Sequence, residues 1–372
     1  MSSPISKIDL FSYELTYVNG EYVMSNGRVI RSLSSTVVKI TTADQLVGWG
    51  ESCPLGSNYL PAHAAGARAA LSEVAPHLIG LDASNPALVA DAMDEHLLGH
   101  AYAKSALDIA CWDVFGHATG RPVCDLLGGR LHESFPLYVA IPQGSPEEMS
   151  STVARLRDQG FERFQLKLGG SQPAEDAARA RAVAEVTGPD SFVSGDANGG
   201  WTLSDAIVAA RLMTDIAEFF LEQPCATFEE CLRVRDHTSL PMILDESIAD
   251  LAALLRAWEA GALEGVNLKL NRLGGLTRTR LLRDVAASLG LMVNVEDSWG
   301  GDLTTAAVSH LAASTDPAAL KLVSFMNDWT NEHIGGYEPR SADGVGAAPA
   351  GPGLGISIDE ERLGQPFASF GA

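Results

Sequence analysis

The sequence contains few cysteines, and their arrangement excludes two classes of protein. Only 5 cysteines occur in 372 residues, and no two of them form a Cys-x-x-Cys pair. Disulfide-stapled secreted domains and zinc modules need cysteines at short, regular spacings. We therefore expect neither a disulfide framework nor a zinc site, and scattered thiols of this kind indicate a reducing cytoplasm.

Long apolar runs and basic side chains are also scarce. No run of about 18 apolar residues occurs, so no transmembrane helix is expected, and the first residues, MSSPISKIDLFSYEL, lack the apolar centre of a secretion signal. The chain has 26 basic and 47 acidic side chains and a formal net charge of −21. Such a surface repels phosphate backbones, which argues against a nucleic-acid partner. It also repels small carboxylates at long range, so a site for such a substrate needs local positive charge.

From about residue 136 onward, one pattern recurs along the chain. A short apolar run ends in a polar residue, and an Ala/Leu/Arg-rich stretch with helical spacing follows. The strand candidates are residues 136–141, 163–168, 191–198, 219–224, 241–247, 265–270, 291–297 and 320–326. This series predicts an α/β fold of the TIM-barrel type. The alternative, an open doubly wound sheet, usually has a glycine-rich phosphate-binding turn after its first strand, and PQGSPEE at 142–148 is not such a turn.

The remaining residues divide into two segments on either side of the predicted barrel. Residues 1–128 contain strand candidates followed by helix candidates, which predicts an α+β domain. Residues 129–327 would form the barrel. Residues 328–372 are rich in glycine and proline and are expected to return over the first domain.

Acidic residues and lysines end successive strands of the predicted barrel. Asp196, Glu222 and Asp245 end three consecutive strands, and Lys167 and Lys269 end the strands on either side. Barrel active sites lie at the rim where such strand ends meet. Three carboxylates at one rim repel each other unless a cation lies among them, and all-oxygen ligation favours Mg²⁺, with Mn²⁺ as a second choice. Taken singly, each acid can equally be a solvated strand end.

The two lysines suit acid–base chemistry beside such a cation. The reference pKa of lysine is about 10.4, and burial near a dication lowers it. Lys167 and Lys269 can then act as general bases on opposite sides of a bound substrate. Gln165 and Asn198 lie two residues from Lys167 and Asp196 and share their strand faces. They are candidates for bonding a ligand or the groups around it, and they can equally be a polar pair satisfied within the barrel.

The order K…DxN…E…D(E)…K on successive strands resembles the enolase superfamily, in its mandelate racemase and muconate lactonizing enzyme branch. The segment AKSALDIACWDVFGHATGRPVCDLLGG at 103–129 is similar to the signature of that branch. The resemblance covers essentially the whole chain. It implies a modified (β/α)7β barrel of the TIM type with an N-terminal α+β capping domain, and a homo-oligomer.

The resemblance also implies a role for each charged residue. By position, Mg²⁺ would be bound by Asp196, Glu222 and Asp245, and the acid/base pair would be Lys167 and Lys269. These lysines would remove the proton α to a carboxylate of a small substrate, and the metal would stabilise the resulting enediolate.

The sequence departs from the family pattern in the strand that carries the first lysine. Gln165 stands where the family usually has a lysine, whose charge would lower the pKa of its neighbour. The seventh strand ends in Glu296 and Asp297, without the histidine of the mandelate racemase type, which suits the two-lysine subgroup. Two lysines without an obvious leaving-group acid favour a 1,1-proton transfer, that is racemisation or epimerisation. Loss of water and cycloisomerisation, which sister members perform with the same pair, stay open.

Residues at the cap and the rim are expected to set the substrate. Tyr59 from the cap and Trp299 from the rim can form an aromatic pair that attracts a cation, and Asp297 is a further candidate contact. Asp302 can contact a substrate ammonium or cap the following helix. The cap pattern is similar to hydroxyproline betaine 2-epimerases and proline betaine racemases, and also to cis-3-hydroxy-L-proline dehydratases.

These resemblances favour epimerisation of a proline-like amino acid or betaine, such as 4-hydroxyproline betaine. The alternatives are dehydration of cis-3-hydroxy-L-proline and racemisation of an N-acyl amino acid or dipeptide. Two further functions stay open: an inactive relative that only binds, and a metal-independent lyase that forms a Schiff base through Lys269.

Overall fold

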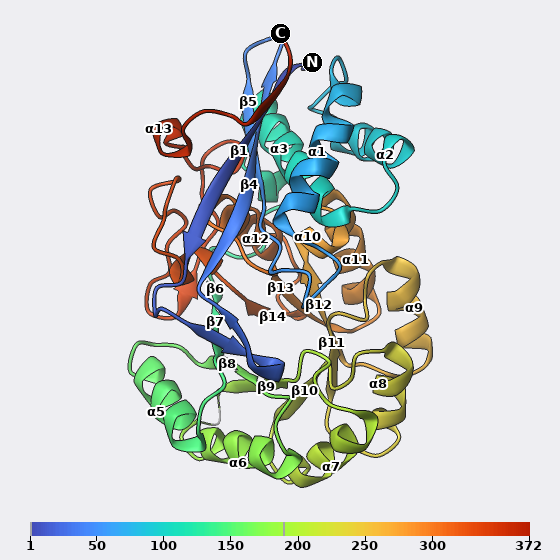
Figure 1. Ribbon diagram of the computed structural model, residues 1–372, viewed down its shortest axis with the longest axis vertical. Helices are drawn as coiled ribbons and strands as arrows, with labels where there is room; N and C mark the ends of the chain where they lie inside the picture. The colour runs from blue at the N-terminus through green and yellow to red at the C-terminus, as the bar shows by residue number, and fades with distance from the viewer. Residues whose placement is uncertain (1, 189) are drawn as a thin grey trace.

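The computed structural model describes residues 2–188 and 190–372, which form a cap and a barrel (Figure 1). Both chain termini lie at the end of the cap away from the barrel. The cap elements are β1 (Ile5–Thr16), β2 (Tyr22–Met24), the 3-10 helix η1 (Ser25–Gly27), β3 (Arg28–Ile30), β4 (Ser32–Thr42), β5 (Val47–Ser52), α1 (Ala64–Leu78), α2 (Pro86–His96), α3 (Ala101–Thr119) and β16 (Ala368–Gly371).

The cap is built on a four-stranded antiparallel sheet in the order β16-β1-β4-β5. Helix α3 lies directly on β5, because a Cβ atom at Gly50 would lie only 1.9 Å from the carbonyl oxygen of Ala106. Only glycine allows the helix backbone to approach so closely. Since β16 pairs with β1, the last residues of the chain lie on the cap sheet.

The barrel begins after the short helix α4 (Val123–Leu126). Its elements are β7 (Tyr138–Ile141), α5 (Pro146–Arg157), β8 (Arg163–Lys167), α6 (Pro173–Ala184), β9 (Phe192–Asp196), α7 (Leu203–Met213), β10 (Phe219–Glu222), α8 (Phe228–Arg235), β11 (Met242–Leu244), α9 (Leu251–Glu259), β12 (Gly265–Lys269), α10 (Leu270–Leu273), α11 (Leu276–Ser288), β13 (Met292–Glu296), α12 (Asp302–Ala313) and β14 (Leu320–Val323). Shorter elements are β6 (Phe135–Pro136), η2 (Met326–Trp329), β15 (Val345–Gly346) and α13 (Glu360–Leu363).

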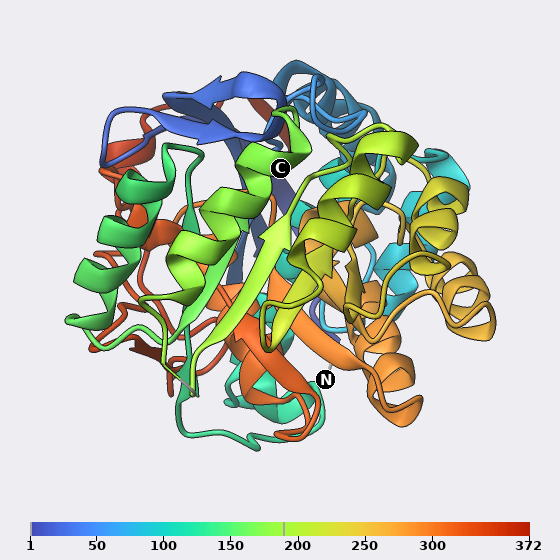
Figure 2. The same ribbon diagram turned by 90° about the horizontal axis from the view of Figure 1, so that it is seen from below.

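The eight barrel strands are parallel and follow one another in sequence order from β7 to β14. The helices lie outside the strands (Figure 2). The predicted TIM-type barrel is therefore confirmed, and each of the eight predicted strand ranges contains one of these strands. Among the residues that the structure describes, β7 and β14 are not hydrogen-bonded to each other, so the barrel has a seam between its first and last strands.

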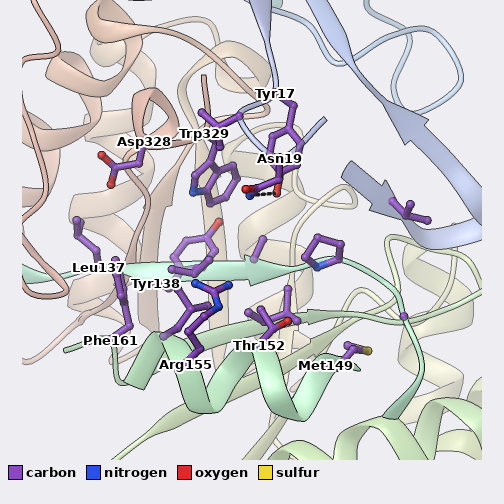
Figure 3. A pocket seen from close by; sticks show the side chains of 18 of the residues that line it. Tyr17, Asn19, Leu137, Tyr138, Met149, Thr152, Arg155, Phe161, Asp328 and Trp329 are labelled. Atoms are coloured by element: carbon purple, nitrogen blue, oxygen red, sulfur yellow. Dashed lines mark hydrogen bonds between the residues drawn. The ribbon is translucent and has the colours of Figure 1, made fainter. Parts of the chain in front are cut away.

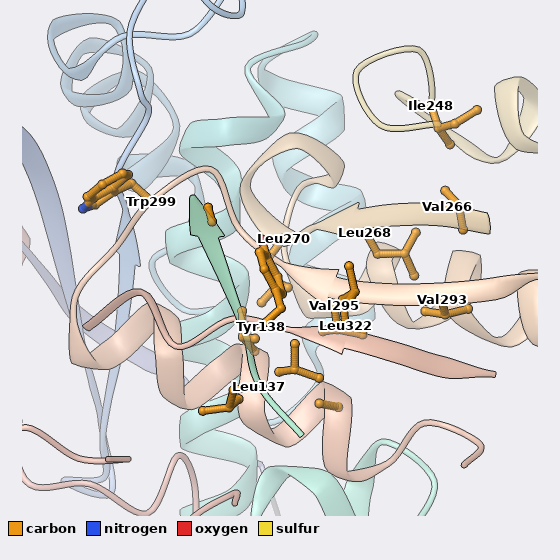
Figure 4. Packing of buried hydrophobic residues seen from close by; sticks show 14 of the residues in the cluster. Leu137, Tyr138, Ile248, Val266, Leu268, Leu270, Val293, Val295, Trp299 and Leu322 are labelled. Atoms are coloured by element: carbon orange, nitrogen blue, oxygen red, sulfur yellow. The ribbon is translucent and has the colours of Figure 1, made fainter. Parts of the chain in front are cut away.

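Alternation along the barrel strands separates an apolar face from a polar one. In β12, Val266 and Leu268 pack toward the helices, and Figure 4 shows them beside the corresponding residues Val293 and Val295 of β13. The intervening residues of these strands point into the barrel. The apolar layer therefore holds the helices in place, and the interior positions are left for polar side chains.

The hairpin β2–β3 carries the cap down onto the barrel mouth. The backbone amide of Asn26 donates to the carbonyl oxygen of Gly169 after β8, at 3.3 Å, and that of Gln143 after β7 donates to Val23, at 2.9 Å. The carboxyl ends of the barrel strands thus face the cap. No helix among the described residues has the length and apolar character to cross a bilayer.

Candidate active site

Lys167 and Asp196 form a buried ion pair at the ends of the neighbouring strands β8 and β9. Lys167 Nζ lies 2.5 Å from Asp196 Oδ2, and the two residues are opposite each other in the strand register. Burial is the largest single influence on the pKa of Lys167 and lowers it, but the charges of Asp196, Tyr22 and Glu222 together outweigh burial, so the pKa is raised. Burial thus acts in the expected direction, but the net direction is upward because the neighbouring carboxylates act against it.

Lys269 and Asp245 form a second ion pair of the same kind, at the ends of the neighbouring strands β12 and β11. Lys269 Nζ donates to Asp245 Oδ2 at 2.6 Å and to the Tyr59 hydroxyl at 2.9 Å. The Arg272 guanidinium also pairs with Asp245. Although burial raises the pKa of Asp245, the charges of Arg272 and Lys269 lower it to about 2. Burial lowers the pKa of Lys269, but the surrounding charges, that of Asp245 first, together raise it more, so both lysines are held as ammonium ions.

Glu222 lies between these two ion pairs and is fully buried. Its carboxylate accepts hydrogen bonds from Gln165 Nε2 at 2.8 Å and from Asn267 Nδ2 at 2.5 Å. Burial and then the negative charge of Asp196 raise its pKa well above the ordinary value. Gln165, which replaces the usual lysine, therefore contacts a carboxylate that is short of positive charge.

The carboxylates of the site suit a divalent cation. Oxygen atoms of Glu222, Asp245 and Glu296 all lie within 4.8 Å of one another. Of the described residues, none hydrogen-bonds Glu296 Oε1, whose nearest cation is Lys269 Nζ at 3.5 Å. A buried oxygen without a donor, among mutually repelling acids, fits a hard cation.

The sequence assigns Asp196 as the third ligand, whereas the geometry groups Glu296 with Glu222 and Asp245. Asp196 also lies near Glu222. Of the charges around Glu222, that of Asp196 raises the Glu222 pKa most. Its oxygens accept hydrogen bonds from Lys167 and Asn198. The ligand set Asp196, Glu222 and Asp245 therefore stays a prediction. Glu296 is a further candidate for a metal ligand, a role that its position at the end of the seventh strand did not indicate.

The predicted substrate-binding residues come together around one inner cavity at the barrel mouth. Tyr59, Trp299, Gln165, Asn198 and Asp297 all line it, together with both lysines. The cavity holds about 30 Å³, space for one or two water molecules. A proline-sized acid enters only if the surrounding cap residues move.

Two of these residues also have hydrogen-bond partners within the protein. Asn198 donates to Asp196 Oδ2 at 2.8 Å and to Glu246 Oε1 at 3.1 Å. Asp297 accepts the backbone amide of Asn271 at 3.1 Å, and burial raises its pKa to about 7. Both side chains therefore organise the polar interior of the site as well as lining the cavity.

Tyr59 and Trp299 line the same cavity, but no ring contact joins them among the described residues. Trp299 makes edge contacts with Tyr17, Tyr22 and Trp329, with ring centroids 5.9, 5.5 and 5.6 Å apart. The Tyr59 ring lies against Lys269 Nζ, 5.4 Å from its centroid. The first cap segment, with Tyr17 and Tyr22, and the segment after β14, with Trp329, supply the aromatic partners of Trp299.

Tyr138 contacts an acid of the site although its sequence position did not single it out, and Asp302 has a structural role that was not predicted. The Tyr138 hydroxyl donates to Glu296, and its interior position on β7 is the only sequence signal that indicated it. Asp302 neither caps its own helix nor faces the cavity. Its carboxylate accepts hydrogen bonds from Asn327 Nδ2 at 2.9 Å and from the backbone amide of Gly335 at 2.7 Å, and so it anchors the C-terminal segment.

An acid-lined parallel barrel beneath an α+β cap is the architecture of an enolase-superfamily enzyme. Residues 18–128 match the family model "Mandelate racemase / muconate lactonizing enzyme, N-terminal domain", and residues 148–362 match "Enolase C-terminal domain-like". The chain belongs to the mandelate racemase/muconate lactonizing enzyme family of that superfamily.

Relatives with named activities cover nearly the whole chain. A cis-3-hydroxy-L-proline dehydratase of Roseibium aggregatum is 40% identical over 98% of this chain and 99% of its own length. An N-succinyl-L-Arg/Lys racemase of Bacillus cereus is 28% identical over 96% of both chains.

Solved structures of related proteins also superpose on nearly the whole chain. A Roseovarius nubinhibens protein complexed with magnesium superposes with a TM-score of 0.95 at 37% identity, covering 99% of this chain and 100% of the other. An Aspergillus oryzae protein superposes with a TM-score of 0.93 at 39% identity, covering 99% of each chain.

Proposed function

We propose that this enzyme removes the proton α to the carboxylate of a proline-like amino acid, in a reaction that depends on a divalent cation, Mg²⁺ before Mn²⁺. The observation that carries the proposal is the pair of lysines that bracket one cavity. Lys167 ends β8 and Lys269 ends β12, and each is paired with its own buried carboxylate. Such a pair can work on both faces of a flat carbanion.

The carboxylates explain how the lysines become bases. As long as Asp196 and Asp245 are free, they hold Lys167 and Lys269 as ammonium ions. Carboxylates that ligate a cation no longer stabilise the adjacent ammonium, so one lysine can release its proton. When bound, Mg²⁺ would also stabilise the negative charge that develops on the substrate carboxylate.

Dehydration of cis-3-hydroxy-L-proline is the reaction that we place first. In this compound the hydroxyl and the carboxylate share one ring face, so the α-proton and the hydroxyl lie on opposite faces. One lysine takes the α-proton, the C3–O bond breaks, and the group on the other side protonates the departing oxygen to give water and a C2=C3 double bond. The similarity to a dehydratase at 40% identity supports this order.

The surroundings of Lys269 offer an acid for the leaving group, which dehydration needs. The Tyr59 hydroxyl accepts a hydrogen bond from Lys269, and burial raises the pKa of Tyr59 well above its ordinary value. Tyr59 and Lys269 are therefore both protonated beside the cavity and able to serve the leaving oxygen.

Epimerisation of a proline-like acid or betaine, such as 4-hydroxyproline betaine, is the second candidate. The rings of Tyr22, Trp299 and Trp329 lie on one side of the inner cavity. Aromatic faces attract quaternary ammonium groups, which favours a betaine over an N-acyl amino acid.

One experiment separates the two reactions. The full-length protein with Mg²⁺ is incubated in deuterium oxide with cis-3-hydroxy-L-proline and, separately, with 4-hydroxyproline betaine. Dehydration gives a product lighter by one water, whereas epimerisation keeps every oxygen and places deuterium at the α-carbon. If neither mass spectrometry nor proton NMR detects a change in a panel of proline derivatives, the proposal of a proline-like substrate fails.

A further inference from the structure

A second, larger pocket lies beside the inner cavity, at the seam between the first and last barrel strands. Its volume is about 620 Å³, within the range of small-molecule sites. Its walls come from the cap segment 17–23, from β7 and α5, and from the segment that follows β14 (Figure 3). We call this the outer pocket.

Two aromatic residues separate the outer pocket from the inner cavity. Tyr138 and Trp329 line both spaces, and their ring centroids are 6.5 Å apart in an edge-on contact. Trp329 is partly exposed, and its ring also contacts Tyr22 and Trp299. The outer pocket therefore adjoins the inner cavity, and the side chains of Tyr138 and Trp329 lie between the two spaces.

Arg155 is the one basic side chain among the residues that line the outer pocket. Figure 3 shows it extending from α5 toward Tyr138. Within residues 2–188 and 190–372, no carboxylate forms an ion pair with it. A guanidinium without a partner, on a chain of net charge −21, is a local attractor for a carboxylate.

The acidic residues of the outer pocket have partners of their own. Glu21 pairs with Arg31, and Glu148 accepts the backbone amide of Ser145 in the cap of α5. Asp328 accepts the Tyr337 hydroxyl at 3.0 Å and stands next to Trp329. The pocket thus offers a free cation at one side and an acid beside an indole ring at the other.

We propose that the outer pocket binds a zwitterionic amino acid or betaine before it enters the inner cavity. The carboxylate pairs with Arg155, and the cationic nitrogen faces Trp329 and Asp328, which suits both electrostatic and cation–π attraction. The ligand class rests on the proposed function, whereas the existence of the site rests on Arg155 and the pocket. An inner cavity of about 30 Å³ makes such a waiting position useful, because the closed site cannot take a substrate directly.

A thiol-protection experiment tests the site without relying on turnover. All 5 native cysteines are buried, so Thr152→Cys on the pocket wall introduces a single accessible thiol. L-proline, which has the carboxylate and the ring nitrogen, should slow the labelling of Thr152→Cys in the full-length protein. It should not slow the labelling of Val208→Cys, an exposed position on α7.

The variant Arg155→Gln tests whether the guanidinium binds the carboxylate of L-proline. Loss of one charge-assisted hydrogen bond should raise the L-proline concentration needed for protection about tenfold. The same substitution should raise KM about tenfold and leave kcat within about twofold, whereas Arg233→Gln, which removes an exposed arginine of α8, should change neither.

The outcomes separate this inference from the proposed reaction. Protection that depends on Arg155 without turnover of any proline derivative keeps the site and rejects the reaction. Turnover with no protection at Thr152→Cys, or protection equal in the Arg155→Gln background, rejects the site.

Discussion

The hydroxyl oxygen of Ser25 lies 3.1 Å from the side-chain oxygen of Asn198, and this contact joins the cap hairpin to the acids of the barrel. The same hydroxyl donates to the carbonyl oxygen of Leu168 at 2.5 Å. Asn198 in turn donates its backbone and side-chain N–H groups to Asp196, both at 2.8 Å. The position of the hairpin and the orientation of Asp196 are therefore coupled through one buried chain of polar contacts.

Ser25→Ala should loosen the hairpin without disturbing the lysines. A buried hydrogen bond contributes about 1 kcal/mol, so KM should rise about fivefold, and amide hydrogen exchange in residues 22–30 should become faster. Ser57→Ala, at an exposed position in the second cap loop, is the matched control. Unchanged exchange in the hairpin of Ser25→Ala would show that this hydroxyl does not hold the loop.

Magnesium binding should discriminate between the two possible sets of ligands. We expect Asp196→Asn to weaken magnesium affinity about 100-fold or more, because loss of a ligand exceeds the tenfold to 100-fold effect of outer groups. Glu296→Gln should cost about tenfold or less. Calorimetric titration of each variant with magnesium measures the difference. The opposite ranking would make Glu296 the third ligand and leave Asp196 as the partner of Lys167.

Magnesium should also stabilise the fold, because the acids that it binds repel one another in its absence. At 100 times the dissociation constant, binding to the native state alone adds about 2.7 kcal/mol to the free energy of unfolding. The melting temperature should therefore fall on chelation and recover on addition of Mg²⁺. In Glu222→Gln this shift should be much smaller, since one of the repelling carboxylates is gone. An equal shift in that variant would place the ion elsewhere.

The sequence predicts the barrel and the charged residues of the site well, because both depend on local patterns. Each barrel strand is an apolar run, and the polar residue that ends it marks the mouth, as at Asp196, Glu222 and Lys269. These positions follow from strand order alone, since parallel strands of a barrel bring their ends together.

The contacts that the sequence could not supply join distant segments of the chain. Trp299 meets Tyr22 from the cap hairpin and Trp329 from the segment after β14, a meeting that depends on how the cap sits on the barrel. The net direction of the Lys167 pKa depends on contacts of the same kind, because the charges of Asp196, Tyr22 and Glu222, which come from three other strands, together outweigh burial.

Replacing either lysine should slow net turnover steeply and separate the steps of the reaction. Lys167→Ala or Lys269→Ala should lower kcat by about 100-fold to 10,000-fold, the usual contribution of a general acid or base. One of the two lysines removes the α-proton. The variant that retains this lysine should still exchange the substrate's α-proton for deuterium in deuterium oxide, whereas the variant that lacks it should not. Lys7→Ala, at an exposed ion pair of the cap, is the control. Full activity in either lysine variant would remove that lysine from the mechanism.

His310 should make the stability of the protein depend on pH between about 4 and 6.5. Burial lowers the pKa of His310 from its ordinary value of 6.5 to about 4. The neutral ring fits its site, since Nδ1 accepts the backbone amide of Cys124 at 3.2 Å and Nε2 donates to the carbonyl oxygen of Leu354 at 3.0 Å.

Protonation of this ring favours the unfolded chain, which binds the proton more readily than the native state does. The stabilising contribution is therefore complete above pH 6.5 and is lost as the pH falls toward 4, by about 3 kcal/mol in total. His310→Gln keeps a donor and an acceptor but cannot titrate, so its free energy of unfolding should fall less steeply over this range. Urea denaturation at a series of pH values measures both slopes, with His96→Gln on the cap surface as the control. Parallel slopes in the wild type and His310→Gln would mean that other groups account for the acid sensitivity.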